Sequence, residues 1–241
     1  MLFRIARKNQ ILQNLYINFS TFIHPAITHS AGIIEILKKA LWQTAIENVE
    51  GGYFEFGVYQ GISLLSAVKI YRNILSSGSA NFSGTPMKRR FYGFDSFEEG
   101  FKHHSAEDMH PLFCEGGYTS SYESCKSRLA KFPEIQLIKG YFEETLNPLT
   151  ISEQVSEEEK CAIAFIDCDL KLPALLALNY IKPKLQKGSI IILDDFFSYK
   201  GNPAAGVSGA WMEFLNQHPA IKARPYFNYG CMGQSYIIFD L

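Results

Sequence analysis

The sequence predicts a doubly wound α/β fold with a mostly parallel, seven-stranded sheet. Two observations lead to this prediction. From about residue 49, short apolar runs alternate with segments of helical periodicity, and such alternation is typical of a parallel sheet with helices on both faces. In addition, the runs 162–166 and 190–193 are apolar throughout, as expected of strands buried on both sides.

The N-terminal residues 1–48 are predicted to form a helical extension on the lid or acceptor side of one main domain, residues 49–241. Two sets of apolar residues recur at helical spacing in this extension. They are Ile11, Leu12, Leu15 and Tyr16 in the first set, and Ile33, Ile34, Leu37, Leu41 and Trp42 in the second.

The remaining elements follow from apolar periodicity and from Gly and Pro punctuation. Parallel strands are expected at 53–57, 91–95, 135–139, 161–166 and 189–193, and two antiparallel strands at 222–228 and 234–239. Helices are expected at 62–75, 120–132, 172–185 and 203–216, with loops at 76–86 and 97–118. The second loop carries His103, His104 and His110, which are expected to be exposed or, alternatively, to contact an acceptor or act as a base.

Composition excludes several classes of function. A net charge of −1 does not indicate the strongly basic surface that binds nucleic acid. Five cysteines without C-x-x-C spacing favour neither a disulfide framework nor a zinc site, and indicate a reducing compartment. No run approaches the roughly 20 apolar residues of a membrane span, and the N-terminus lacks the apolar core of a secretory signal. We therefore expect a cytoplasmic protein with a small-molecule partner, neither nucleic acid nor membrane as partner, and possible homo-oligomers.

The candidate chemistry lies where the strands end, because ligands of such folds bind at the carboxyl ends of the strands. Gly57 and Gly61 frame the turn after the first strand, and glycine lets the backbone approach a ligand closely. This turn is either a tight βα connection or the seat for the amino-acid end of a cofactor, with Glu55 ordering the turn or binding an ammonium group. Asp95 ends the second strand and is suited to a ribose diol, although Asp95 and Ser96 are also good helix N-caps.

Four aspartates form the sharpest feature. Asp167 and Asp169 flank Cys168 after one strand, and Asp194 and Asp195 end the next. Carboxylates gathered at one sheet edge repel one another, and a hard divalent cation with oxygen ligands removes that repulsion. The alternative is that some of them are solvent-facing helix caps.

Five segments together resemble the macrocin O-methyltransferase family: Gly52 to Gly61, Tyr92 to Glu98, Lys139 to Leu146, Ile166 to Leu170 and Leu193 to Phe196. The resemblance implies a class I methyltransferase fold of the Rossmann-like type that binds S-adenosyl-L-methionine and usually Mg²⁺. Members of this family methylate sugar hydroxyls of macrolide and aminocoumarin natural products.

Carried over by position, the resemblance implies specific roles. Asp95 would bind the ribose, Ser96 would lie toward the adenine, and Asp169 would be the general base. Gly140, Tyr141 and Phe142 would line the adenine side. Asp167, Asp194 and Asp195 would hold the metal, with Asp167 also near the cofactor. The methionine part would be held by the first segment, namely Glu55, Phe56, Gly57, Val58, Tyr59, Gly61 and the following Ser63.

The chain departs from the family pattern on the acceptor side. Cys168 stands where glycine is usual, and Lys171 stands where tyrosine is usual. Two other functions stay open at this point. An NAD-dependent oxidoreductase would need the G-x-G-x-x-G turn, which the first strand lacks, and a non-catalytic cofactor-binding module would not need the aspartates.

Overall fold

The computed structural model describes residues 9–241 apart from 77–87, 104, 148–150 and 153. The loop expected at 76–86 and the side chain of His104 therefore fall largely or wholly outside the described residues. Among the described residues, seven strands form one sheet in the order β3-β2-β1-β4-β5-β7-β6. Five of them are parallel, and β7 runs antiparallel to both β5 and β6. The predicted fold class is confirmed.

The strands lie close to their predicted positions. Their bounds are β1 Gly52–Phe56, β2 Phe91–Asp95, β3 Ile135–Lys139, β4 Cys161–Ile166, β5 Ile190–Leu193, β6 Lys222–Tyr229 and β7 Gly233–Asp240. Every residue of β1, β4 and β5 is buried, because helices cover both faces of the sheet.

Successive residues along the strands point alternately into two separate hydrophobic cores, one on each face of the sheet. One face packs against α3 (Pro25–Ile46), α4 (Ile62–Ser76) and α5 (Tyr122–Leu129), and the other against α6 (Phe142–Thr145), α8 (Lys171–Ile181) and α9 (Gly206–Gln217). On the second face Phe56 stacks on Phe94, with ring centroids 4.8 Å apart. Such aromatic pairs stabilise the strand register beyond simple burial of area.

That register brings the strand ends to one edge. Phe56 pairs with Phe94 of β2 and with Ile166 of β4, and Ile166 pairs with Leu193 of β5. The residues that follow these partners therefore lie side by side at the ends of four strands. This is the edge at which the strand order reverses, between β1 and β4, and where ligands bind in doubly wound folds.

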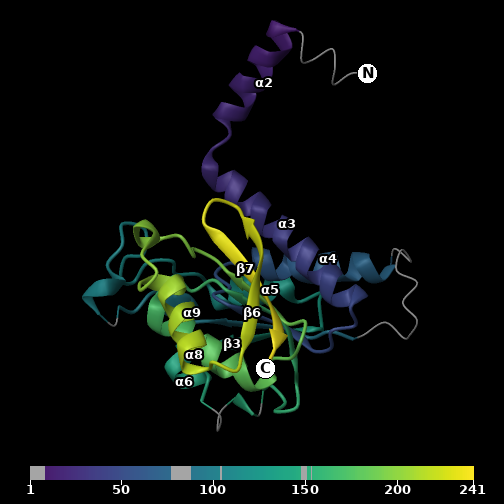
Figure 1. Cartoon of the computed structure of the whole chain (residues 1–241), viewed down its shortest axis with the longest axis vertical. Coiled ribbons are helices and arrows are strands. Elements are labelled where there is room, and N and C mark those ends of the chain that lie inside the picture. The colour runs from purple at the N-terminus through teal and green to yellow at the C-terminus, as the bar shows by residue number, and fades with distance from the viewer. Residues whose placement is uncertain (1–8, 77–87, 104, 148–150, 153) are drawn as a thin grey trace.

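The N-terminal helices differ from each other. α3 belongs to the main core, since Ile36, Leu37 and Leu41 are fully buried on the sheet. By contrast α2 (Gln10–Phe22) has no buried residue and projects away from the body (Figure 1). The division of the chain at residue 48 stays a prediction.

Two helices are shorter than expected for local reasons. Ser121 caps α5 by accepting a hydrogen bond from the Ser124 amide, so this helix starts at Tyr122. α8 ends at Ile181 and passes into the 3₁₀ turn η3 (Lys182–Lys184), because Pro183 lacks the amide hydrogen that an α-helix would use. Three further 3₁₀ turns are η1 (Phe97–Glu99), η2 (Ala106–Asp108) and η4 (Tyr199–Gly201). No helix within the described residues is long and apolar enough to cross a membrane.

Candidate active site

A cavity of about 400 Å³ opens at the carboxyl edge of the parallel strands. It is lined by residues from the strand ends, from α3 and from the 97–118 loop. The predicted site residues among them are Gly57, Tyr59, Asp95, Ser96, Gly140, Tyr141, Phe142, Asp167, Asp169, Asp194 and Asp195.

The turn after β1 passes directly against the end of β4. Gly57 has φ +96°, and a Cβ at this position would lie 1.8 Å from the carbonyl oxygen of Asp167. Only glycine fits such a conformation and such an approach. The glycine therefore lets the two strand ends form one continuous cavity wall.

Asp95 holds this turn in place. Its Oδ2 accepts hydrogen bonds from the amides of Val58 and Tyr59, each at 2.7 Å, and its Oδ1 accepts one from the amide of Phe97. Burial raises the pKa of Asp95, and the three backbone hydrogen bonds oppose that rise. The local capping role considered for Asp95 is thus present, and the same carboxylate lines the cavity.

Glu55 acts from beneath the turn instead of lining the cavity. Its carboxylate is fully buried and accepts hydrogen bonds from the hydroxyls of Tyr53 and Ser63, both at 2.6 Å. Burial raises the pKa of Glu55 to about 7. Five residues of the predicted methionine-binding segment do not line the cavity: Glu55, Phe56, Val58, Gly61 and Ser63.

The far end of the cavity is formed where β3 ends. The Gly140 amide donates to the carbonyl of Asp95 at 3.0 Å, which ties the β2 and β3 ends together. The Ser96 hydroxyl donates to the Gly100 carbonyl at 3.1 Å, and the Tyr141 hydroxyl to the Glu99 carbonyl at 3.4 Å. The residues expected on the adenine side are therefore adjacent in space.

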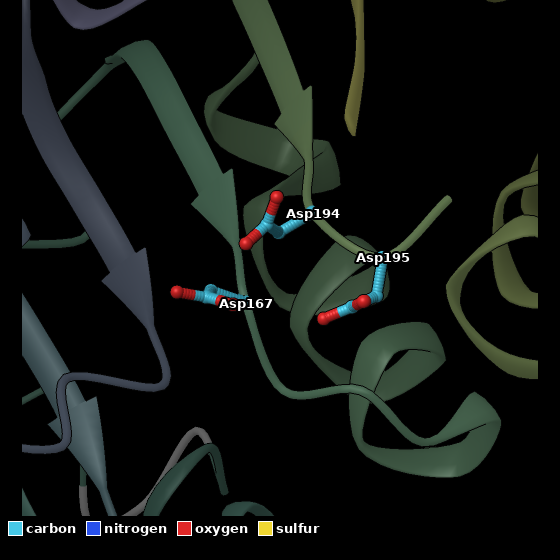
Figure 2. A group of neighbouring side chains, drawn as sticks. All are labelled: Asp167, Asp194 and Asp195. Atoms are coloured by element: carbon cyan, nitrogen blue, oxygen red, sulfur yellow. The ribbon is translucent and has the colours of Figure 1, made fainter. Parts of the chain in front are cut away.

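Three carboxylates that line the cavity lie close together where β4 and β5 end (Figure 2). One ligand atom from each of Asp167, Asp194 and Asp195 lies within 4.8 Å of the others. Burial, followed by the charges of Asp194, Asp169 and Asp195, raises the pKa of Asp167 well above its usual value. The Ser198 hydroxyl donates to Asp195 at 2.9 Å. This donor set of hard oxygens is the kind that binds Mg²⁺ or Ca²⁺.

Asp169 reaches the cavity through a turn and not along the strand. Strand alternation would place Asp167 and Asp169 on one face if β4 continued to Asp169, but β4 ends at Ile166 and Asp169 has φ +61°. A tight turn, in which the Leu170 amide donates to the Cys168 carbonyl at 2.6 Å, carries it to the site. The N-cap residue of α8 is Leu170 and not Asp169. Burial, and then a hydrogen bond with Asp195, raise the pKa of Asp169 well above its usual value.

Sequence reasoning missed Ser198 and also two residues that contact Asp194. His29 of α3 lies with Nε2 3.1 Å from Asp194 Oδ2, and its Nδ1 accepts a hydrogen bond from the Cys231 amide at 3.1 Å. Because Nδ1 is the acceptor, Nε2 carries the proton and donates to Asp194. The Tyr229 hydroxyl donates to the other oxygen of Asp194 at 2.9 Å. The hydrogen bond to Asp194 raises the pKa of His29.

This contact depends on a close approach of backbones. A Cβ at Gly32 would lie 2.3 Å from the Gly230 amide nitrogen, and one at Gly230 would lie 2.4 Å from His29 Nδ1. The two glycines let α3 rest on the turn between β6 and β7. No local sequence pattern signals a pair of residues 165 positions apart, and the two glycines are recognisable only after the contact is seen.

Two histidines of the 97–118 loop, His103 and His110, support the loop itself. His103 Nε2 lies 2.7 Å from the Phe113 carbonyl oxygen. His110 stacks on Phe113 at 4.4 Å and lies 4.8 Å from the ring of Tyr199. Neither histidine lines the cavity, whereas Phe101, Lys102 and Tyr118 of the same loop do.

With this geometry established, comparison with known proteins identifies the family. Residues 54–196 match the family model described as "Methyltransferase domain", which is more than half of the chain. The chain belongs to this methyltransferase family. No curated protein sequence matches it significantly.

Solved structures agree on the fold. CalS11, a calicheamicin methyltransferase, is 23% identical with a TM-score of 0.61 over 83% of this chain and 76% of its own. The O-methyltransferase NovP is 16% identical with a TM-score of 0.63 over 86% and 79%. An O-methyltransferase from Bacillus cereus in complex with SAH is 14% identical with a TM-score of 0.52 over 86% and 81%. At these identities the likeness establishes the class I methyltransferase fold.

Proposed function

We propose that this protein is an S-adenosylmethionine-dependent O-methyltransferase that uses a divalent cation, Mg²⁺, and acts on a hydroxyl of a small sugar-like acceptor. The observation that carries the proposal is the composition of one cavity. It brings together a glycine turn, Asp95 and a group of three carboxylates, of which Asp194 is buried and the other two are half-buried, and Asp169 lines the same cavity.

The cofactor seat is proposed to run along the cavity wall. The turn at Gly57 and Tyr59 would take the amino-acid end, and residues 140–142 would take the adenine. Asp95 would accept a hydrogen bond from the ribose diol. Each carboxylate oxygen has two lone pairs, so the three backbone hydrogen bonds already made by Asp95 leave one lone pair, on Oδ1, for a ribose hydroxyl. Membership of the methyltransferase family supports this placement.

The residues present fit a divalent cation. Three carboxylates within 4.8 Å repel one another at partial or full burial, and a cation that they share removes this repulsion. Asp167, Asp194 and Asp195 would hold it. When bound, the cation supplies Lewis acidity that lowers the pKa of a coordinated hydroxyl, and the cofactor supplies an activated methyl group.

The chain's own residues would then align the acceptor and take its proton. Asp169 lines the cavity next to Asp195, and its carboxylate is proposed to accept the hydroxyl proton as general base. His29 and Tyr229 fix the orientation of Asp194 through its two oxygens. Alignment of donor and acceptor in one closed space accounts for much of the rate of such transfers.

The acceptor class is proposed from aromatic residues of the cavity and from the comparisons. Tyr59, Phe101 and Tyr118 line the cavity, with Tyr59 and Tyr118 packed edge to face at 6.0 Å, and such rings offer faces on which a sugar ring can pack. The extension 1–48 is proposed to form part of the acceptor side, since His29, Ser30 and Ile33 also line the cavity. CalS11 is described as a TDP-rhamnose 3'-O-methyltransferase, which agrees with the resemblance to the macrocin O-methyltransferase family.

A methyl-transfer assay tests the proposal. Labelled S-adenosylmethionine and Mg²⁺ are incubated with nucleotide deoxysugars and with glycosylated macrolides and aminocoumarins. We expect label on a hydroxyl, loss of transfer with a chelator, and recovery with added Mg²⁺. Asp169→Asn should lower kcat by roughly 10²–10⁴, the range for loss of a general base. Its affinity for S-adenosylhomocysteine (SAH), the demethylated cofactor, should be unchanged. Turnover that survives chelation would refute the metal, and near-normal kcat in Asp169→Asn would refute the base.

A further inference from the structure

The exposed apolar side chains of the protein are concentrated at its N-terminal end. Of the 21 large apolar side chains that are exposed in the described part of the chain, 11 lie between residues 10 and 46. Seven are on α2 and four on α3. We call these 11 residues the N-terminal stripe: Ile11, Leu12, Leu15, Tyr16, Ile17, Phe19, Phe22, Ile27, Ile34, Trp42 and Ile46.

On α2 most of the stripe forms one face of an amphipathic helix. Ile11, Leu15, Phe19 and Phe22 recur at intervals of three and four residues, so they lie along one side. None of these side chains is buried, and the helix stands clear of the body (Figure 1). A lone helix of 13 residues is only marginally stable in water. A surface of this kind normally marks an interaction site.

On α3 the stripe continues along the outer face. Ile27, Ile34 and Trp42 are spaced by seven and eight residues, which returns to the same side of a helix. The opposite side of α3 is buried in the core and includes Ile36 and Ala40. α3 is therefore apolar toward the core and carries a second, exposed apolar row.

We propose that the N-terminal stripe is the interface of a homodimer, in which α2 and the outer face of α3 pack against the same elements of a second copy. At roughly 100 Å² of exposed surface for each large side chain, the stripe presents on the order of 1,000 Å². Each partner of a standard protein interface buries about 800 Å². The area of the stripe is thus what a stable dimer needs.

The charge of α2 favours a second copy over other occupants. The helix contains no Lys, Arg, Asp or Glu, and its polar side chains are Gln, Asn, Ser and Thr. Helices that lie on membranes carry Lys and Arg on their polar face, which α2 lacks. Without charge there is also no electrostatic selection for a differently charged partner. An uncharged apolar stripe is complementary to itself, as a two-fold interface requires.

Sedimentation velocity of the full chain over about 0.1–50 µM tests this proposal. We expect a dimer, and the double variant Leu15→Asp, Phe19→Asp should raise the dimer dissociation constant at least 100-fold. The matched control is Leu112→Asp, Phe239→Asp. It places the same charges at sites of similar exposure, 55% and 53% against 60% and 68%, and should leave the dimer intact.

Hydrogen exchange on the wild type provides a readout that does not depend on a variant folding. The α2 amides should exchange slowly at about 50 µM and fast at about 0.1 µM. A wild-type monomer at 50 µM, equal weakening by the two double variants, or α2 exchange that does not change with concentration would overturn the proposal. So would a monomer that binds phosphatidylcholine–phosphatidylglycerol vesicles through α2.

Discussion

Neutralising one carboxylate of the acidic group should make the metal-free protein more stable while abolishing its response to Mg²⁺. Two unit charges 4.8 Å apart repel by roughly 3 kcal/mol at an effective dielectric constant of about 20. Asp167 faces two such partners, and its raised pKa shows that ionisation is costly in the folded state. Asp167→Asn removes this cost, and among the described residues the Asp167 side chain makes no hydrogen bond that the substitution would break. We expect a gain of about 2 kcal/mol near pH 8, or roughly 4–8 °C in Tm for a chain of this size.

The assay is thermal unfolding with and without Mg²⁺ at constant ionic strength. If about 10 mM Mg²⁺ is some 100 times the dissociation constant, binding stabilises the wild type by about 2.7 kcal/mol. Asp167→Asn should show almost none of that increase. Asp240→Asn is the control, because Asp240 is exposed and paired with Lys187, and it should keep the full response. A destabilised metal-free Asp167→Asn, or a variant that responds to Mg²⁺ as the wild type does, would refute the reasoning.

Three further predictions concern residues around the cavity. His29→Ala should weaken Mg²⁺ affinity about tenfold in calorimetry, as loss of a group that orients a metal ligand does; unchanged affinity would contradict the role of the His29–Asp194 contact. Asp95→Ala should lower SAH affinity at least tenfold and also lower Tm, since three amides lose their acceptor; intact affinity would refute the ribose site. The pKa of Glu55 is raised by burial to about 7 from 4.5, so the folded state binds the proton more tightly and the stability from this group falls as pH rises from about 4.5 to 7. We expect urea unfolding to show that the free energy of unfolding of Glu55→Gln falls by about 3 kcal/mol less than that of the wild type over this pH range. Identical pH profiles of the unfolding free energy for the wild type and Glu55→Gln would contradict this prediction.

The strands were predictable because a strand that is buried on both faces consists almost entirely of apolar residues. Cys161–Ile166 and Ile190–Leu193 have no polar residue to compete with the strand interpretation. Helix ends were less predictable, because they depend on single contacts. The Ser121 cap and the proline in η3 shift boundaries by a few residues without changing the core.

The candidate site was predictable where chemistry follows strand ends and not where it depends on packing across the chain. Asp167, Asp194 and Asp195 meet because β4 and β5 are neighbours in register. The burial of Glu55 beneath the turn could not be foreseen, since strand sequences do not say which side chains lie under a loop. The contact of His29 with Asp194 joins α3 to the end of β5, and only the packing of α3 on the β6–β7 turn creates it.

Calorimetric titration of SAH into the wild-type protein tests the central claim most directly, because it asks whether this cavity is a methyl-donor site without requiring the acceptor. We predict one site per chain with a dissociation constant in the micromolar range, weakened at least tenfold in Asp95→Ala, and no heat of binding with NAD. Binding of NAD without binding of SAH would contradict the account and would assign the cavity to a different cofactor.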